Sequence, residues 1–226
     1  MHRAAQRRDH GSRRGEGGLR GVWRRFRDTL RHPLRDETFR PPMAKQYANI
    51  PERWARFIAE QKIFFVATAT KDSRINISPK GLDALRVLDR NRVVWMNLTG
   101  SGNESAAHVQ TDPRMTLMFL AFTGDPVILR LYGTARAIHH ADAEWPVLAA
   151  LFPPLPGARQ IFDVAVDLVQ TSCGFGVPYF DFAGDRPDLA AWTEKKGRDG
   201  LQQYWRERNA VSIDGIATEM GDKNPD

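Results

Sequence analysis

The chain has 226 residues, enough for one domain with its own hydrophobic core. Hydrophobic residues make up 42% and charged residues 27% of the sequence, which is typical of a globular protein and argues against wholesale disorder. The single cysteine excludes an internal disulfide framework and fits a cytoplasmic location, and no apolar run approaches the roughly 20 residues of a membrane-spanning helix.

The first 42 residues carry the positive charge of the chain. The formal net charge is +6, and this segment alone holds 12 arginines against 5 acidic residues, so the remainder is close to neutral. Because the segment has few aliphatic residues, it is predicted to be a disordered extension, and Met43 is a candidate translation start. A helix with Trp23, Phe26 and Leu30 on one face, contacting an anionic surface, is the alternative. Since the charge is confined to this tail, no nucleic-acid or membrane partner is expected.

From Met43 onward the sequence predicts one helix and then a series of short strands. Apolar residues at helical spacing predict the helix over 51–61. The strands are β-branched or alternating, tight turns separate them, and Pro79 is expected to end the second. They are expected over 63–70, 74–78, 85–88, 92–98, 115–122, 127–138 and 162–168. Short strands at this spacing favour an antiparallel barrel, for which we expect a domain over 43–182.

Further helices lie between and after the strands. Ser101 followed three residues later by Glu104 predicts a capping box at a helix start, and Asp112-Pro113 predicts its end. The C-terminal residues 183–226 are interpreted as a helical extension. Helices are expected over 101–111, 143–152, 188–194 and 197–208.

Phosphate binding is the one chemistry that the residue pattern indicates. The six histidines lack metal-ligand spacing and there is no cysteine pair, so neither a metal site nor a hydrolytic constellation is expected. The strand that ends at Leu98 runs into a glycine-containing turn over 99–103, which would present free backbone N–H groups. Together with the ammonium of Lys80, this turn would form a cradle for a phosphate monoester. An ordinary strand–turn–helix with a surface lysine is the alternative interpretation.

Five segments resemble the pyridoxamine 5′-phosphate oxidase superfamily. They are Phe64–Ala69, Asn76–Gly81, Trp95–Ala106, Asp112–Phe119 and Leu129–Ala135. The resemblance covers roughly residues 43–182. It implies a mainly β fold with flanking helices (α+β), built as a six-stranded antiparallel Greek-key split β-barrel. It also implies a homodimer with FMN bound at the interface.

The resemblance assigns cofactor-binding residues but no catalytic residue. The strand around residue 78 is expected to line the flavin ring edge and the phosphate side, the end of the next matched strand the isoalloxazine and ribityl chain, and the turn after it the phosphate. One arginine lies on the strand that reaches across the dimer interface. In this order the residues are Asn76, Ser78 and Lys80; Asn97, Leu98 and Thr99; Ser101, Gly102 and Asn103; and Arg130.

The phosphate-facing turn departs from the family pattern. The oxidases present Ser-Arg-Lys there, whereas this chain has Asn103-Glu104-Ser105. Each charge-assisted contact contributes about 1.5–3 kcal/mol, so losing two would weaken FMN binding by on the order of hundredfold unless other groups replace them.

The sequence therefore predicts an FMN-binding, flavin-dependent oxidoreductase of unknown small-molecule substrate. The segment Ser172–Pro178 looks like an uncharacterised branch of the superfamily rather than the vitamin-forming oxidase. Two alternatives stay open: a non-catalytic flavin-binding or sensing protein, and a deazaflavin or haem binder on the same fold.

Overall fold

The computed structural model describes residues 44–224, so the predicted basic extension and the candidate start at Met43 lie outside the described residues. Within them, eight strands form one antiparallel sheet in the order β3-β2-β6-β7-β8-β5-β4, with β1 paired to β8. The mainly antiparallel fold is as predicted, whereas the prediction of six strands was too low. The strands are β1 (Lys45–Tyr47), β2 (Phe64–Thr68), β3 (Asn76–Lys80), β4 (Leu85–Asp89), β5 (Arg92–Leu98), β6 (Arg114–Leu120), β7 (Val127–Ile138) and β8 (Ala158–Cys173).

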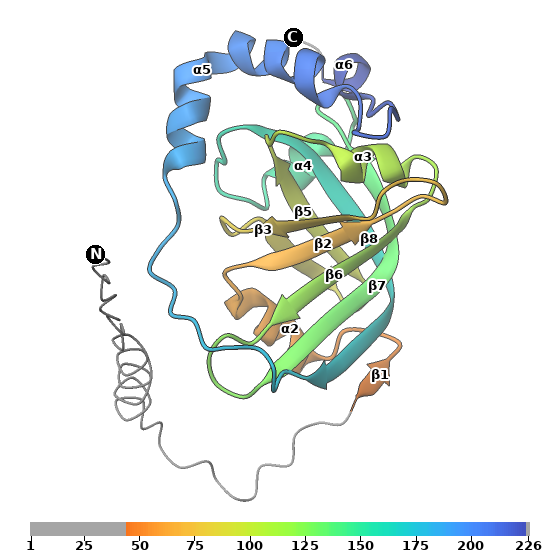
Figure 1. Cartoon of the computed structure of the whole chain (residues 1–226), viewed down its shortest axis with the longest axis vertical. Helices are drawn as coiled ribbons and strands as arrows, with labels where there is room; N and C mark the ends of the chain where they lie inside the picture. Colours follow the sequence, from red (N-terminus) through yellow and green to blue (C-terminus); the bar gives the residue numbers. More distant parts are fainter. Residues whose placement is uncertain (1–43, 225–226) are drawn as a thin grey trace, which may run out of the picture. The chain divides into compact units, whose positions relative to one another are not determined.

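The helices gather at the two ends of the sheet and on one outer face. Figure 1 shows α2 at one end, and α5 and α6 across the opposite end beside α3. α5 is kinked at Gly197, whose φ of 65° is non-helical, so the two helices predicted there adjoin. The helical segments are α2 (Glu52–Glu60), α3 (Glu104–Val109), α4 (Trp145–Ala149), α5 (Asp188–Tyr204), the π-helix η1 (Trp205–Asn209) and α6 (Met220–Lys223).

The sheet wraps around the larger of two apolar clusters. Phe64 of β2 and Trp95 of β5 are separated by three strands in the sheet order, yet their ring centroids lie 6.2 Å apart. Trp95 also stacks on Phe162 of β8 at 4.4 Å. Because the inward faces of β2, β5, β6, β7 and β8 share one apolar cluster, the strands enclose a barrel-like interior. Ile58 of α2 is buried in the same cluster and covers its lower end.

Two local predictions were wrong. β3 continues through Pro79, which pairs with Phe65, because β3 is an edge strand where a missing N–H costs no ladder hydrogen bond. The capping box does not form: α3 begins after Asn103, no side chain caps it, and the Glu104 carboxylate accepts from the backbone N–H of Ile213 instead. The Glu104 carboxylate, which the local sequence assigned to the helix cap, therefore binds the C-terminal segment instead.

In the part of the chain that the structure covers, no helix combines the length and apolar character that a membrane crossing requires.

Candidate functional site

A cavity of about 820 Å³ opens at the end of the barrel next to α3, a size in the range of small-molecule sites. Its walls come from β3, the end of β5, the turn before α3 and the start of β8. Residues 189, 208 and 211–213 of the C-terminal segment complete the lining, so this segment forms a roof over the site.

Nine of the ten residues assigned to the cofactor line this one cavity. Successive side chains of β3 point to opposite faces of the sheet, so Asn76, Ser78 and Lys80 share one face. They are partly buried, while the residues between them are exposed. The structure thus brings the assigned residues together, and their role as cofactor contacts stays a prediction. The nine are Asn76, Ser78, Lys80, Asn97, Leu98, Thr99, Ser101, Gly102 and Asn103.

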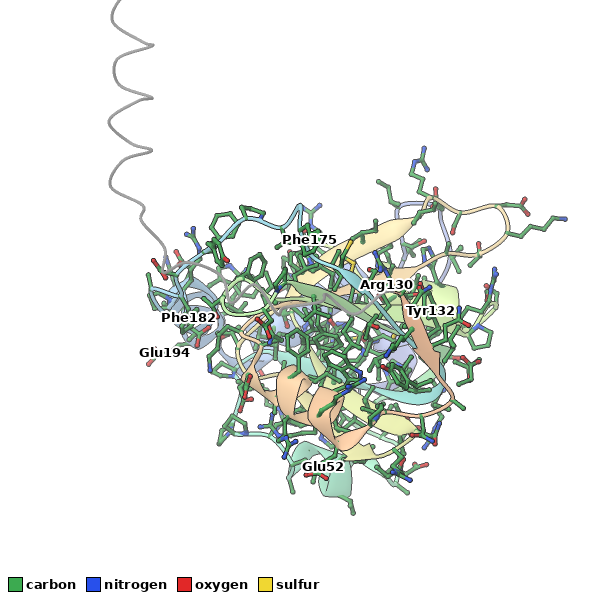
Figure 2. All side chains as sticks on the ribbon, turned by 90° about the horizontal axis from the view of Figure 1, so that it is seen from below. Glu52, Arg130, Tyr132, Phe175, Phe182 and Glu194 are labelled. Atoms are coloured by element: carbon green, nitrogen blue, oxygen red, sulfur yellow. The ribbon has the colours of Figure 1, made fainter. Side chains whose placement is uncertain are left out.

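Arg130 lies elsewhere, on the outer side of β7. Its Nη1 donates to Ser172 Oγ at 3.0 Å, and Figure 2 shows it beside Tyr132, away from α2. The Tyr132 hydroxyl in turn lies 3.1 Å from Gln170 Oε1. Within one chain, Arg130 therefore does not contribute to the cavity.

Lys80 brings a desolvated cation into the cavity. Its ammonium lies 5.4 Å from the centre of the Trp95 ring, at the mouth of the barrel interior. Burial, and to a lesser extent the nearby charge of Arg159, together lower the pKa of Lys80 to about 8. Because burial destabilises the charged form of Lys80, an anion bound beside the ammonium would stabilise it.

Arg159 is a second buried cation, which the sequence analysis did not identify. It is 2% exposed, and its Nη atoms donate only to neutral oxygens, Asn209 Oδ1 at 2.6 Å and the Gly102 carbonyl at 2.8 Å. Its Nε has no partner among residues 44–224. Burial lowers the pKa of Arg159 to about 9, which leaves it charged at neutral pH.

The described cavity lining has an excess of positive charge. It contains three basic side chains, those of Lys80, Arg159 and Arg208, and one acidic side chain, that of Glu104. None of the ion pairs between described residues involves Lys80 or Arg159. Desolvated charges are normally paired, so the partly buried Lys80 and the buried Arg159, both without a carboxylate, indicate an anion site.

Hydroxyl and amide groups line the wall on the β3 side. Asn76 Nδ2 donates to Ser105 Oγ at 3.1 Å and to Thr68 Oγ1 at 3.3 Å. Thr68 Oγ1 lies 3.1 Å from Nδ1 of the buried His108. This network fixes Asn76 and Ser105 at the cavity wall, where they can bind a polar ligand without moving.

The roof is attached by directional bonds around the cavity. Trp205 Nε1 donates to Thr99 Oγ1 at 2.8 Å, and Thr99 Oγ1 donates to the Gly157 carbonyl at 2.7 Å. Asn209 Nδ2 donates to the Gly100 carbonyl at 3.1 Å, while its Oδ1 accepts from Arg159. At the rim, Arg74 of the barrel forms an ion pair with Asp214 of the roof.

A second cavity, of about 830 Å³, lies between α2 and the β4 hairpin. Apolar core residues such as Ile58 and Phe119 form part of its lining. Arg86 on its rim is paired with Asp83. It lacks the buried, unpaired cations of the first cavity, which is therefore the better candidate site. No group of metal-ligating side chains occurs in the described chain.

A family model and a relative of known family both match this chain. The family model described as pyridoxamine 5′-phosphate oxidase matches residues 50–173. The pyridoxamine 5′-phosphate oxidase family protein ustO of Aspergillus flavus is 33% identical over 188 residues, which are 75% of this chain and 76% of the relative.

Solved structures show a more distant likeness. HupZ of Group A Streptococcus has a TM-score of 0.41 and 14% identity, covering 52% of this chain and 91% of HupZ. The FAD binding protein of Mycobacterium smegmatis has a TM-score of 0.41 and 13% identity, covering 55% of this chain and 96% of that protein.

Proposed function

Because this chain belongs to the pyridoxamine 5′-phosphate oxidase family, we propose that the cavity under the roof binds FMN and that the protein is a flavin-dependent oxidoreductase acting on a small molecule. The observation that carries the proposal is a pair of cations in the cavity, the partly buried Lys80 and the buried Arg159, without a carboxylate partner among the described residues. FMN carries a phosphate, and a phosphate would offset the desolvation of both cations.

The residues present fit this cofactor. The phosphate-facing turn lacks the family's arginine–lysine pair, but the cavity still contains two cations. One of them, Arg159, enters the cavity from β8 rather than from the turn. Ser78, Ser101 and Ser105 add hydroxyl donors on the same lining. When bound, FMN would supply the redox chemistry, and the protein would supply binding, orientation and exclusion of water by the roof.

The proposal needs no nucleophile from the chain. The titratable groups of the lining are Lys80, Glu104, Arg159 and Arg208, and Glu104 is held by the backbone of Ile213. This set can bind and orient a charged ligand. It resembles no acyl-transfer or metal-dependent site, which favours chemistry located on a cofactor.

The test compares FMN with riboflavin, which lacks the phosphate. We expect the purified chain to take up FMN, seen as a yellow protein with quenched flavin fluorescence, and to bind riboflavin at least tenfold more weakly. Lys80→Gln and Arg159→Gln should each reduce FMN affinity about tenfold to a hundredfold. Each should also reduce the difference between the affinities for FMN and for riboflavin. Lys62→Gln, an exposed lysine outside this cavity, is the matched control and should bind both ligands like the wild type. A chain that takes up no flavin would refute the proposal.

Turnover separates an enzyme from a binding protein. Oxidation of NAD(P)H by the FMN-loaded chain, with oxygen or another acceptor, supports an oxidoreductase. Bound FMN that is never reduced by any donor would instead favour the flavin-binding or sensing role.

We also propose that the protein is a homodimer, in which Arg130 of one copy approaches the flavin of the other. An exposed apolar surface on the edge strand β3 supports this proposal.

A further inference from the structure

Three carboxamide side chains meet beside the cavity. Asn97 extends from the end of β5, Asn103 precedes α3, and Gln160 lies at the start of β8. The Asn97 Nδ2 group contacts both neighbours, donating to Asn103 Oδ1 at 3.3 Å and to Gln160 Oε1 at 3.0 Å. Asn97 is therefore the central member of this amide triad, and all three side chains are almost fully buried.

Each member of the triad keeps one buried polar atom without a partner in the described structure. These atoms are the acceptor Asn97 Oδ1 and the donors Asn103 Nδ2 and Gln160 Nε2. A buried polar group left unpaired costs about 1–3 kcal/mol, so three in contact are a large local cost. Such a concentration indicates that a ligand supplies the missing partners.

Asn103 gives a second reason to assign a binding role. It occupies the N-cap position of α3, where an asparagine side chain normally caps the helix. Here it makes no cap bond and instead accepts from Asn97. Two of the triad, Asn97 and Asn103, line the cavity, while Gln160 stands behind Asn97 and holds its carboxamide.

From this arrangement we infer that Asn97 and Asn103 recognise a cyclic imide, the pyrimidinedione edge of the bound ring. An imide presents one N–H between two carbonyl oxygens, and the triad leaves one acceptor and two donors without partners. Asn97 Oδ1 accepts from the imide N–H, and Asn103 Nδ2 donates to a flanking carbonyl rather than to the phosphate, as the resemblance implied for it. Gln160 is a positioning residue. The inference rests on the proposed function and selects among its cofactors: flavins and deazaflavins carry this imide, and haem does not.

The test uses FMN and 3-methyl-FMN, in which a methyl group replaces the imide hydrogen. For the wild-type chain we expect methylation to weaken binding about tenfold or more, because Asn97 Oδ1 loses its donor and meets a methyl group. Asn97→Leu keeps the branched arrangement of heavy atoms and has no polar atoms, so it should bind FMN about tenfold more weakly. It should also bind the two ligands within about twofold of each other.

Gln160→Met is the second variant, and it keeps the experiment decisive if Asn97→Leu does not fold. It should lower the discrimination between the two ligands while leaving the cavity lining intact. Gln61→Leu removes a carboxamide at the end of α2, outside this cavity, and should keep the wild-type ratio. Equal binding of FMN and 3-methyl-FMN by the wild type would overturn the triad's role and leave the proposed function standing. Absence of binding to either would overturn the proposed function itself.

Discussion

At the scale of single residues, the cavity stores an electrostatic cost that ligand binding would relieve. Lys80 and Arg159 are both cations in a partly desolvated site, and each lowers the stability of the folded chain relative to a neutral residue of similar size. Such an arrangement is typical of binding sites, where affinity for a ligand is gained at the expense of stability without it.

Lys80→Met should stabilise the ligand-free chain. The folded-state pKa of about 8 lies below the unfolded value of 10.5, so the unfolded chain binds more protons between these pH values. The wild type is thus penalised at pH 7, and its stability rises as the pH increases from 8 to 10.5. We expect Lys80→Met to raise the free energy of unfolding by about 2 kcal/mol at pH 7, and the difference to vanish near pH 10.5. Urea unfolding at both pH values measures it.

Lys62→Met, at an exposed lysine, should change neither the free energy of unfolding at pH 7 nor its dependence on pH. A Lys80→Met chain that is less stable than the wild type at pH 7 would show that the contact of the ammonium with the Trp95 ring outweighs the cost of its burial.

The two cations differ in what sequence reasoning could find. Lys80 could be assigned because it lies in a short strand–Pro–Lys–Gly unit that matches a family segment. Arg159 could not be assigned, because an arginine at the start of a strand is normally exposed. Its burial depends on the roof residue Asn209, which lies 50 residues further along the chain. Charges buried by distant segments leave no local signal.

At the scale of elements, the long pairing of β7 and β8 depends on one glycine. The register shifts between Tyr132 and Gly133, and a Cβ on Gly133 would lie 2.0 Å from the backbone oxygen of Ala165. Because that contact is with backbone, no side-chain rotation can relieve it.

Gly133→Ala should therefore lower the free energy of unfolding by about 3 kcal/mol or more, measured by chemical denaturation. Gly176→Ala is the control: its added Cβ meets nothing within 4 Å, so its stability should stay within about 0.5 kcal/mol of the wild type. Similar stabilities for the two variants would show that the bulge can shift.

The roof should open when Asn209 loses its side chain. Asn209 is fully buried and joins Arg159 to the Gly100 carbonyl, so Asn209→Ala leaves a buried guanidinium with one fewer acceptor. We expect a loss of about 2 kcal/mol, concentrated in residues 188–224 and seen as faster amide hydrogen exchange there. Gln203→Ala, on the exposed side of α5, should leave the exchange rates unchanged. Uniform acceleration across the barrel would contradict a separate roof.

Element boundaries could be predicted where period and turn residues decide them. β5 and β7 have the predicted limits, because both are apolar, β-branched runs that turn residues bound. β8 runs over Ala158–Cys173, well beyond the predicted seven residues, because its first half is buried on both faces, with Phe162 in the main core and Ile161 in a second apolar cluster with Leu148 of α4, so polar and apolar residues do not alternate there. The start of α3 was misplaced since its cap residues are engaged by Asn97 and by the roof.

At the scale of the whole molecule, the edge of the sheet beside the cavity is apolar and unpaired in the described chain. Ile77 of the edge strand β3 is 65% exposed, and Ile75 just before it is 75% exposed. Across the cavity rim, Val211 and Ile213 of the roof are 53% and 71% exposed. Monomers usually protect such edges with charged residues, so this surface favours contact with a second copy.

We expect the chain to be a dimer by size-exclusion chromatography with light scattering, and Ile77→Lys to convert it to a monomer. A lysine in the apolar contact would be buried without a partner, which should weaken the association at least a hundredfold. Val147→Lys is the matched control, because Val147 is 72% exposed on α4, away from this edge, and the variant should remain dimeric. FMN affinity supplies the decisive comparison: if the site is completed by the partner, Ile77→Lys weakens FMN binding although Ile77 does not line the cavity. A monomeric Ile77→Lys chain with wild-type FMN affinity would show that one chain builds the whole site.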